Sequence, residues 1–330
     1  MNPHSAPLLR VRNLETEFRR DDTITHALRG VSFHVDPGEM LGIVGESGCG
    51  KSVLSLSILR LLPRETGRIL AGEVTFDGRD FVRLSEPEMR KVRGDRIAMI
   101  FQEPMTSLNP VYTVGAQIAE AIRIHTRATR REAWAKAEEM LRLVRIPDPQ
   151  QRARTYPHQL SGGMRQRVMI AMALSCSPRL LIADEPTTAL DVTIQAQILR
   201  LILDLKECTQ TAVMLITHDL ALVAEVCQRV IVMYAGKIVE EANVSTLFRR
   251  SAHPYTIGLL RSIPKRGKGR TRLPEIAGVV PNLRVPIVGC SFAPRCVFAK
   301  QICREQNPPL RNFDTGHLVA CWRAEEVVAA

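Results

Sequence analysis

The sequence predicts an α/β fold whose core is a parallel sheet. Three short apolar runs, at 40–44, 180–183 and 212–217, have the length and composition of buried strands. A helical pattern at 52–62 follows the first run, and a helical segment precedes each of the other two. Strands that alternate with helices are typical of parallel sheets, because each connection must cross the sheet.

Further strands are predicted on either side of this core. Residues 8–11 and 31–35 alternate between apolar and polar side chains, as half-buried strands do. Residues 230–239 have the pattern of a hairpin with Gly236 at its turn.

An α-helical insertion is predicted at 116–170, between the two halves of the core. Its clearest helix carries apolar side chains at intervals of three and four residues, which place them on one helical face. These residues are Trp134, Ala137, Leu141 and Val144. Beyond His253 the pattern breaks into Pro, Gly and Cys punctuation, so we expect a C-terminal extension at 251–330.

Composition excludes several classes of protein. Apolar residues make up 45% and charged residues 24%, the balance of an ordinary soluble globular protein. No apolar stretch approaches the ~20 residues of a membrane span, and 1–10 lack the apolar region of a secretion signal, so a cytoplasmic protein is expected. The net charge of +11 would suit nucleic acid, but aromatic residues make up only 5% and no nucleic-acid module is present. The basic run 265–272 is interpreted as a solvated linker, with a patch for anionic lipid headgroups as the alternative.

A glycine-rich loop at 45–52 (GESGCGKS) matches the pattern GxxxxGK[ST] and lies between a predicted strand and a predicted helix. Its backbone N–H groups and the helix N-terminus should face phosphate oxygens. Lys51 is expected to reach the β- and γ-phosphates, and the Ser52 hydroxyl to ligate Mg²⁺. Beside Lys51, the Cys49 thiol is expected to have a lowered pKa. The predicted nucleotide contacts are Gly45, Ser47, Gly48, Cys49, Gly50, Lys51, Ser52 and Val53.

Two carboxylates follow the apolar run 180–183. They should lie at the carboxyl edge of the sheet, where ligands bind in open α/β folds. Asp184 is expected to hold Mg²⁺, through water, and Glu185 to orient and polarise the attacking water as general base. Together with the loop, these acids predict a P-loop ATPase.

The segment 157–167 (PHQLSGGMRQR) resembles the LSGGQ signature of ABC ATPases, with Met164 where Gln is commoner. It offers a hydroxyl and bare amides at a predicted helix N-terminus. The resemblance implies that Ser161, Gly162 and Gly163 contact the ATP bound to an opposing subunit, so that two cassettes close head-to-tail on two nucleotides.

Other parts of the ABC pattern follow in order. Gln102 (IFQEP) resembles the Q-loop that contacts Mg²⁺, Asp191 (ALD) the D-loop at the dimer seam, and His218 (ITHD) the switch histidine that touches the γ-phosphate. Phe18 is the candidate for stacking on adenine, with a core or turn role as the alternative. The resemblance implies an ABC cassette at 1–250, comprising the P-loop core, an antiparallel β subdomain and a helical subdomain at about 106–170.

Longer segments resemble the D-type ATPase subunit of dipeptide/oligopeptide importers: 101–112, 156–173, 183–198 and 253–256 (HPYT). The resemblance covers nearly the whole chain. It implies ATP-driven import of di- or oligopeptides, with this subunit peripheral on the cytoplasmic face of the bacterial inner membrane. The implied partners are a second, related ATPase subunit, two membrane permeases and, indirectly, a peptide-binding protein. A soluble ABC ATPase acting on nucleic acid or ribosomes, and an importer of a non-peptide cargo, stay open.

Four cysteines gather in the tail with the spacing Cys290-x5-Cys296-x6-Cys303-x17-Cys321. Clustered thiols in a cytoplasmic protein favour a metal over disulfides. No CxxC knuckle typical of structural zinc is present, whereas four-thiolate iron–sulfur sites tolerate varied spacings. Zinc and free or disulfide-bonded thiols stay open as alternatives. The resemblance to peptide-importer subunits implies a [4Fe–4S] cluster with a structural role.

Overall fold

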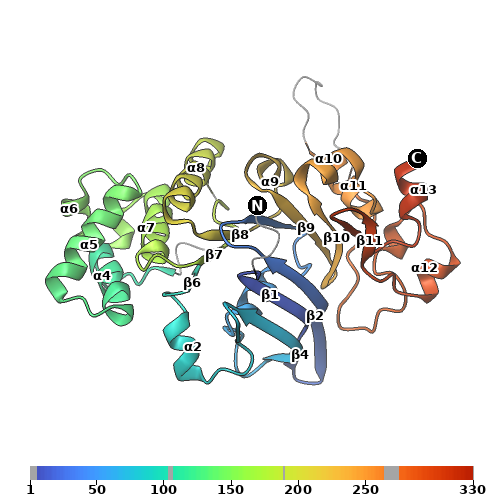
Figure 1. The fold of residues 1–330 in the computed structure, drawn as a ribbon, viewed down its shortest axis with the longest axis horizontal. Coiled ribbons are helices and arrows are strands. Elements are labelled where there is room, and N and C mark those ends of the chain that lie inside the picture. The colour runs from blue at the N-terminus through green and yellow to red at the C-terminus, as the bar shows by residue number, and fades with distance from the viewer. Residues whose placement is uncertain (1–5, 103–106, 189, 264–274, 330) are drawn as a thin grey trace. The chain divides into compact units, whose positions relative to one another are not determined.

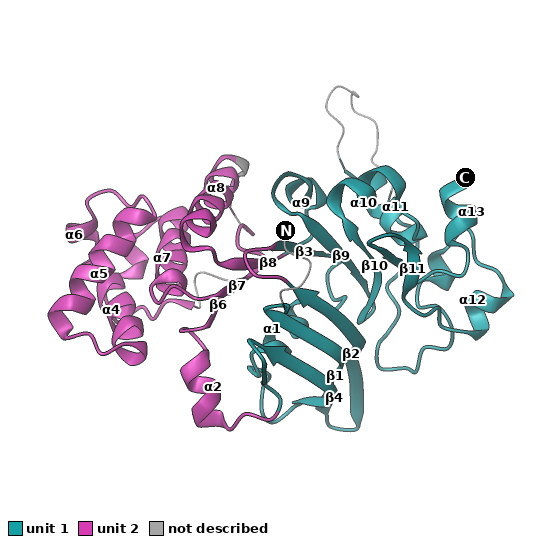
Figure 2. Cartoon of the chain, in the orientation of Figure 1, with its two compact units in different colours: residues 1–35, 40–82, 216–330 teal, residues 36–39, 83–215 magenta. Residues whose placement is uncertain are grey.

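The computed structural model describes residues 6–102, 107–188, 190–263 and 275–329 (Figure 1). The chain forms two compact units, which Figure 2 distinguishes by colour. Unit 1 comprises 1–35, 40–82 and 216–330, and unit 2 comprises 36–39 and 83–215. The chain therefore enters unit 2 briefly at 36–39, builds most of it at 83–215 and returns to unit 1 after each of these segments.

Unit 1 contains a four-stranded antiparallel sheet with the order β2-β1-β4-β5. The strands are β1 (Leu9–Arg20), β2 (Thr23–Val35), β4 (Gly67–Phe76) and β5 (Arg79–Asp80). This confirms the predicted strands at 8–11 and 31–35, although both strands are longer than predicted. The pairing of β1 with β2 shifts register between Val11 and Glu17, and such irregularities interrupt the apolar alternation on which the prediction depends.

A second sheet gives unit 1 its core. β3 (Met40–Val44) lies parallel to β9 (Arg229–Tyr234), and β10 (Lys237–Asn243), β12 (His317–Val319) and β11 (Arg311–Asp314) continue the sheet antiparallel. The predicted hairpin is confirmed: β9 and β10 are joined by Ala235 (φ 47) and Gly236 (φ 76), the two left-handed residues of a tight hairpin turn.

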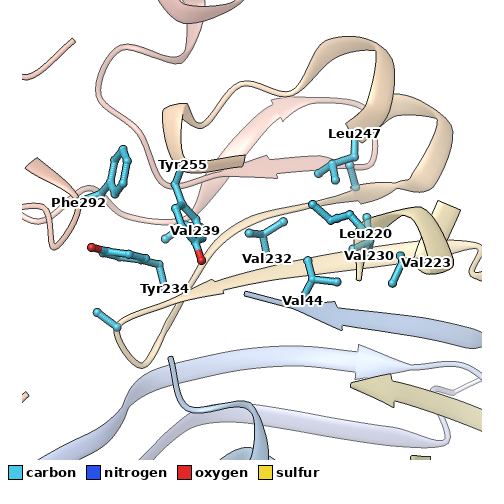
Figure 3. Close-up of a cluster of buried hydrophobic side chains, with 12 residues drawn as sticks. Val44, Leu220, Val223, Val230, Val232, Tyr234, Val239, Leu247, Tyr255 and Phe292 are labelled. Carbon is cyan, nitrogen blue, oxygen red and sulfur yellow. The ribbon is translucent and has the colours of Figure 1, made fainter. Parts of the chain in front are cut away.

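Helices cover this sheet or follow its strands. They are α1 (Lys51–Ile58), α9 (Leu220–Val226), α10 (Val244–Arg250), α11 (Pro254–Arg261), α12 (Gln301–Glu305) and α13 (Ala324–Ala329), with a short 3₁₀ helix at Ala293–Arg295. α1 ends earlier than the predicted 52–62, because Arg60 takes a left-handed conformation (φ 52). Apolar side chains of β3, β9, β10, α9, α10 and α11 form one buried cluster, which Figure 3 shows together with Phe292 of the tail.

A buried carboxylate ties the tail to the sheet. Glu240 on β10 is fully buried and accepts hydrogen bonds from the backbone N–H groups of Ala252 (2.6 Å) and His253 (3.1 Å). The Nε2 atom of His317 on β12 lies 2.8 Å from its Oε1 atom. Because an unpaired buried carboxylate would be costly, these partners fix where the chain enters α11.

Unit 2 combines strands with a helical segment. β8 (Ala212–Thr217), whose residues 212–215 belong to this unit, β7 (Leu180–Asp184) and β6 (Ile97–Ile100) follow one another in that order, with β6 parallel to β7. Its helices are α2 (Glu86–Val92), α4 (Val114–His125), α5 (Arg130–Leu143), α6 (Pro149–Arg152), α7 (Gly162–Leu174) and α8 (Val192–Thr209), with a 3₁₀ helix at Pro157–Gln159.

The predicted helical insertion is confirmed by α4, α5 and α7, which pack on one another. The α5 helix begins at a capping box formed by Thr129 and Glu132. Ala137 and Leu141 are buried on the predicted apolar face, and Val144, which caps the helix C-terminus, is buried as well. Among the residues described, none of the helices combines the length and the apolar character that crossing a bilayer requires.

Candidate functional site

The glycine-rich loop connects β3 to α1 in unit 1. Gly45 lies so close to β9 that a Cβ atom there would be 2.3 Å from the Met233 carbonyl oxygen. Gly50 is the N-cap of α1 with φ 106, and a Cβ atom on it would be 2.8 Å from the Ala27 carbonyl oxygen. Only glycine fits at either position, so the loop can lie tightly against the sheet.

Lys51 folds back over this loop. Its Nζ atom donates to the carbonyl oxygens of Gly45 (2.7 Å) and Glu46 (3.1 Å), and the residue is only 5% exposed. Ser47 and Gly48 are exposed at the tip of the loop, while Ser52 and Val53 are partly buried in the first turn of α1. The loop therefore presents open backbone beside one buried cation.

Cys49 corrects the sequence prediction. The residue is fully buried, and burial raises the pKa of its thiol, although the Lys51 ammonium acts in the opposite direction. The lowered pKa is expected from the helix N-terminus and from the neighbouring Lys51 charge. Loss of hydration outweighs both influences here, because the thiolate is the form that burial disfavours.

The end of β7 brings two predicted residues together in unit 2. Gln102, after β6, donates from Nε2 to Oε2 of Glu185 at 3.1 Å, although the two are 83 positions apart in sequence. Thr188 donates its hydroxyl to the same oxygen at 2.8 Å. Asp184 is the last residue of β7 and is buried. Glu185 has a left-handed backbone (φ 46), a conformation that is rare for glutamate and is concentrated at functional sites.

Two more predicted residues begin helices of unit 2. The Ser161 hydroxyl caps α7 by accepting from the N–H of Met164 at 3.3 Å, and Asp191 caps α8 by accepting from the N–H of Ile194 at 3.0 Å. Ser161 and Gly162 are exposed, and a Cβ atom on Gly162 would meet only the Leu190 side chain, at 3.8 Å. The α7 N-terminus is therefore an open surface.

The remaining predicted residues lie in unit 1. His218 is exposed directly after β8, one residue before the Asp219 side chain caps α9. Phe18 is partly buried on β1, opposite Thr25 and Gly67. Unit 1 thus holds the glycine-rich loop, His218 and Phe18, whereas Gln102, Ser161, Gly162, Gly163, Asp184, Glu185 and Asp191 belong to unit 2.

Sequence reasoning missed two residues that contact the loop. The Tyr255 hydroxyl accepts from the backbone N–H of Glu46 at 2.8 Å. Arg295 donates to both carboxylate oxygens of Glu46, at 2.6 and 3.0 Å. In the sequence, Tyr255 stands out only as part of the HPYT segment, which indicates the family and not a contact with the loop. Arg295 stands out only because it precedes Cys296.

The tail cysteines overturn the prediction of an iron–sulfur or zinc site. All four line one cavity of about 20 Å³, which has room for about one water molecule. In the described ranges of the chain, no group of three or more His, Cys, Asp or Glu residues is placed to hold a metal ion. The four are free thiols, and burial raises the pKa of Cys290, of Cys296 and, to about 12, of Cys321. Burial thus favours the protonated thiol over the thiolate that binds metals.

Comparison with known proteins shows two family matches. Residues 28–188 match the ABC transporter family, and residues 239–303 match the C-terminal region of oligopeptide/dipeptide transporters. A probable peptide ABC transporter ATP-binding protein of Sinorhizobium fredii is 67% identical over 328 residues, covering 99% of this chain and 98% of the relative. The dipeptide transport ATP-binding protein DppD of Haemophilus influenzae is 52% identical, covering 93% of this chain and 92% of its own length.

Solved structures agree in fold. The dimeric post-hydrolysis structure of the ATP-binding cassette MJ0796 with ADP and Pi has a TM-score of 0.64 and 29% sequence identity. It covers 72% of this chain and 98% of the cassette. The structure of cbiO1 from Clostridium perfringens, part of the cbiONQ transporter complex, has a TM-score of 0.63 at 26% identity. It covers 74% of this chain and 91% of cbiO1.

Proposed function

Because the chain belongs to the family of ATP-binding subunits of oligopeptide/dipeptide ABC transporters, we propose that its ATPase activity drives import of di- or oligopeptides. The main observation in favour of a peptide cargo is the match of 239–303 to the C-terminal region of oligopeptide/dipeptide transporters. Relatives named for peptide or dipeptide transport, matched over more than nine-tenths of the chain, support the same cargo.

In this proposal the loop 45–53 binds the triphosphate of ATP. The exposed backbone of Ser47 and Gly48 and the buried Lys51 ammonium supply donors and positive charge for the phosphate oxygens. Phe18 would stack on adenine, and His218 would contact the γ-phosphate. The Phe18 ring offers adenine only part of its surface for stacking, because it is already partly buried on β1.

Glu185 is the proposed general base, which takes a proton from the attacking water. Its carboxylate is oriented by donors from Gln102 and Thr188, an arrangement that holds an acceptor in one position. Ser52, Asp184 and Gln102 offer hydroxyl, carboxylate and amide oxygens, the hard ligands that Mg²⁺ prefers. When bound, Mg²⁺ would neutralise charge on the phosphate oxygens.

Complete ATP sites in this proposal need a second cassette. Ser161, Gly162 and Gly163 would contact the nucleotide of a related ATPase subunit, with Asp191 at the seam between the two. The open N-terminus of α7 supports this role, as does the dimeric form of the related MJ0796 cassette. We further propose two permeases and, indirectly, a peptide-binding protein as partners. The complex would lie at the bacterial inner membrane, with this chain peripheral on its cytoplasmic face and 251–330 as a C-terminal extension to a cassette at 1–250.

Transport by the reconstituted complex tests this function. In proteoliposomes with the permeases and the second ATPase subunit, the Glu185→Gln variant should lower ATP turnover by at least ~10²-fold, because the base is lost. Uptake of a radiolabelled dipeptide should fall in parallel, while ATP binding persists. Glu225→Gln, at an exposed site on α9, is the matched control and should keep wild-type activity.

Two results would contradict the proposal. Full turnover by Glu185→Gln would remove Glu185 from the chemistry. Purification of the chain from detergent-solubilised membranes with RNA or ribosomes, and without permeases, would instead support a nucleic-acid function.

A further inference from the structure

We propose that Arg295 and Tyr255 are positioning residues for ATP binding, because they hold Glu46 and neutralise its carboxylate beside the phosphates. Glu46 is the second residue of the glycine-rich loop. Both residues that hold it lie far along the chain, 209 and 249 positions from it, in the segment that follows the hairpin. The C-terminal extension would thereby act directly on nucleotide affinity.

Arg295 and Glu46 form a two-pronged ion pair. One guanidinium nitrogen lies 2.6 Å from Oε2 and the other 3.0 Å from Oε1. The arginine side chain is 4% exposed and the glutamate side chain 28% exposed. Two parallel hydrogen bonds fix both the distance and the plane of the carboxylate, which a single contact would leave free to rotate.

Other contacts hold Arg295 itself in place. Its Nε atom donates to the Ala277 carbonyl oxygen at 3.0 Å, and Nη2 donates to the Ile276 carbonyl oxygen at 3.0 Å. Its guanidinium lies 5.8 Å from the ring centres of both Tyr234 and Phe292. The arginine is thus fixed by the extension, and Glu46 is held to a rigid partner.

Tyr255 holds the backbone of the same residue. The Glu46 N–H donates to the Tyr255 hydroxyl at 2.8 Å. The tyrosine ring is fully buried, with its centre 4.6 Å from that of Tyr234 and 5.4 Å from that of Phe292 (Figure 3). Because the Glu46 N–H is engaged by Tyr255, the loop's open donors for phosphate lie after Glu46.

Because Glu46 is negatively charged, the way it is held should affect the affinity of the loop for ATP. A carboxylate in a phosphate-binding loop repels the phosphates and competes for the Lys51 ammonium, which already contacts the Glu46 carbonyl oxygen. Pairing with Arg295 removes the net charge and directs the carboxylate toward the extension. Loss of Arg295 alone should therefore weaken ATP binding, whereas loss of both charges should restore it. This inference rests on the proposed phosphate-binding role of the loop.

Equilibrium titration of the full chain with a fluorescent ATP analogue and Mg²⁺ tests the idea. Arg295→Met should bind about tenfold more weakly, a loss of about 1.4 kcal/mol. The double variant Glu46→Gln/Arg295→Met should return to within about twofold of wild type. Tyr255→Phe, which removes only the hydroxyl, should bind about threefold more weakly. A purely structural role for Arg295 predicts instead that the double variant is at least as impaired as the single one.

Arg250→Met is the matched control. Arg250 also pairs with a carboxylate, that of Asp314 at 3.1 Å, and lies 5.7 Å from the Phe313 ring centre. Glu46 is held by Tyr255 and Arg295 and not by Arg250, so substitution of Arg250 should leave affinity within about twofold of wild type. Thermal melting of every variant identifies any that is unfolded at the assay temperature; if Arg295→Met is, Tyr255→Phe and the double variant carry the test.

Lys51→Ala separates this inference from the proposed function. If Lys51→Ala binds the analogue as tightly as wild type does, the loop does not bind phosphate and the proposed function fails. If Lys51→Ala binds weakly while folded Arg295→Met and Tyr255→Phe bind like wild type, the loop assignment stands and the positioning role is wrong. The positioning role is also wrong if the folded double variant binds the analogue no more tightly than Arg295→Met does.

Discussion

At the scale of single residues, burial shifts the pKa of two side chains, Cys49 in the loop and His253 at the start of α11. It raises the pKa of the Cys49 thiol and lowers the pKa of His253 to about 4, although Glu240 acts on His253 in the opposite direction. In both cases burial favours the neutral form. His253 then serves as an acceptor, because its Nδ1 atom caps α11 by accepting from the Tyr255 N–H at 3.1 Å.

This buried histidine predicts acid sensitivity. In the unfolded chain a histidine has a pKa of about 6.5, so between about pH 6.5 and about pH 4 the unfolded state binds the extra proton. The free energy of unfolding should therefore fall as pH drops through this window, by roughly 3 kcal/mol in total from His253. Urea unfolding at pH 7, 5.5 and 4.5 measures the loss.

His253→Asn provides the comparison. Asparagine can keep the helix cap and does not titrate, so the variant should lose less stability than wild type between pH 7 and pH 4.5. His158→Asn, at an exposed histidine, should keep the wild-type slope. Equal slopes for wild type and His253→Asn would show that His253 does not carry the effect.

At the scale of elements, two hairpins of unit 1 use the same turn residue under different packing. Gly236 joins β9 to β10 with φ 76, and a Cβ atom on it would lie 2.6 Å from the Ala27 carbonyl oxygen. Gly316 joins β11 to β12 with φ 68, and a Cβ atom there would meet no atom within 4 Å. The first glycine is required by backbone conformation and by space, the second by conformation alone.

Alanine substitution should separate these two requirements. Gly316→Ala should lower the free energy of unfolding by about 1 kcal/mol, the cost of a left-handed alanine. Gly236→Ala should cost more, about 2 to 3 kcal/mol, because the β9–β10 turn must also move away from Ala27. Chemical denaturation of both variants measures the difference, and equal losses would mean that the close approach has no energetic consequence.

At the scale of the whole molecule, the nucleotide residues are divided between two units and, in the proposed assembly, between two chains. At the α7 N-terminus, a Cβ atom on Gly162 would make only an ordinary contact with the Leu190 side chain, at 3.8 Å. A substitution there should consequently leave this chain folded and act only on a nucleotide that a partner brings to it.

Hydrolysis should therefore depend on the second ATPase subunit. Adding that subunit should raise the specific ATPase activity of this chain at least tenfold, because each ATP site is completed across the seam. Gly162→Asp should abolish most of the stimulation, since a carboxylate beside the helix N-terminus repels phosphate, without changing the melting temperature. Colorimetric phosphate release measures both. If ATPase activity depended only on the amount of this chain and did not change when the second ATPase subunit was added, the shared site would be contradicted.

Much of the fold and most of the candidate site follow from local sequence patterns. The runs at 40–44 and 180–183 lie in buried strands because they are short and almost continuously apolar, and the glycines at 45 and 50 mark places where no side chain fits. Polar strands such as β11 and the irregular β1 were missed or shortened, because pairing partners rather than apolar alternation define them.

The glycine-rich loop, the acids after β7 and the α/β alternation were thus determined by the sequence itself. Only the tertiary structure decided that Gln102 meets Glu185 and that Arg295 and Tyr255 hold Glu46. It also decided that Cys49 is buried with a raised pKa and that the tail thiols surround a cavity of one-water size. Periodicity records which face of an element is apolar, whereas contacts between distant residues, and the burial that sets their ionisation, arise only when the elements pack.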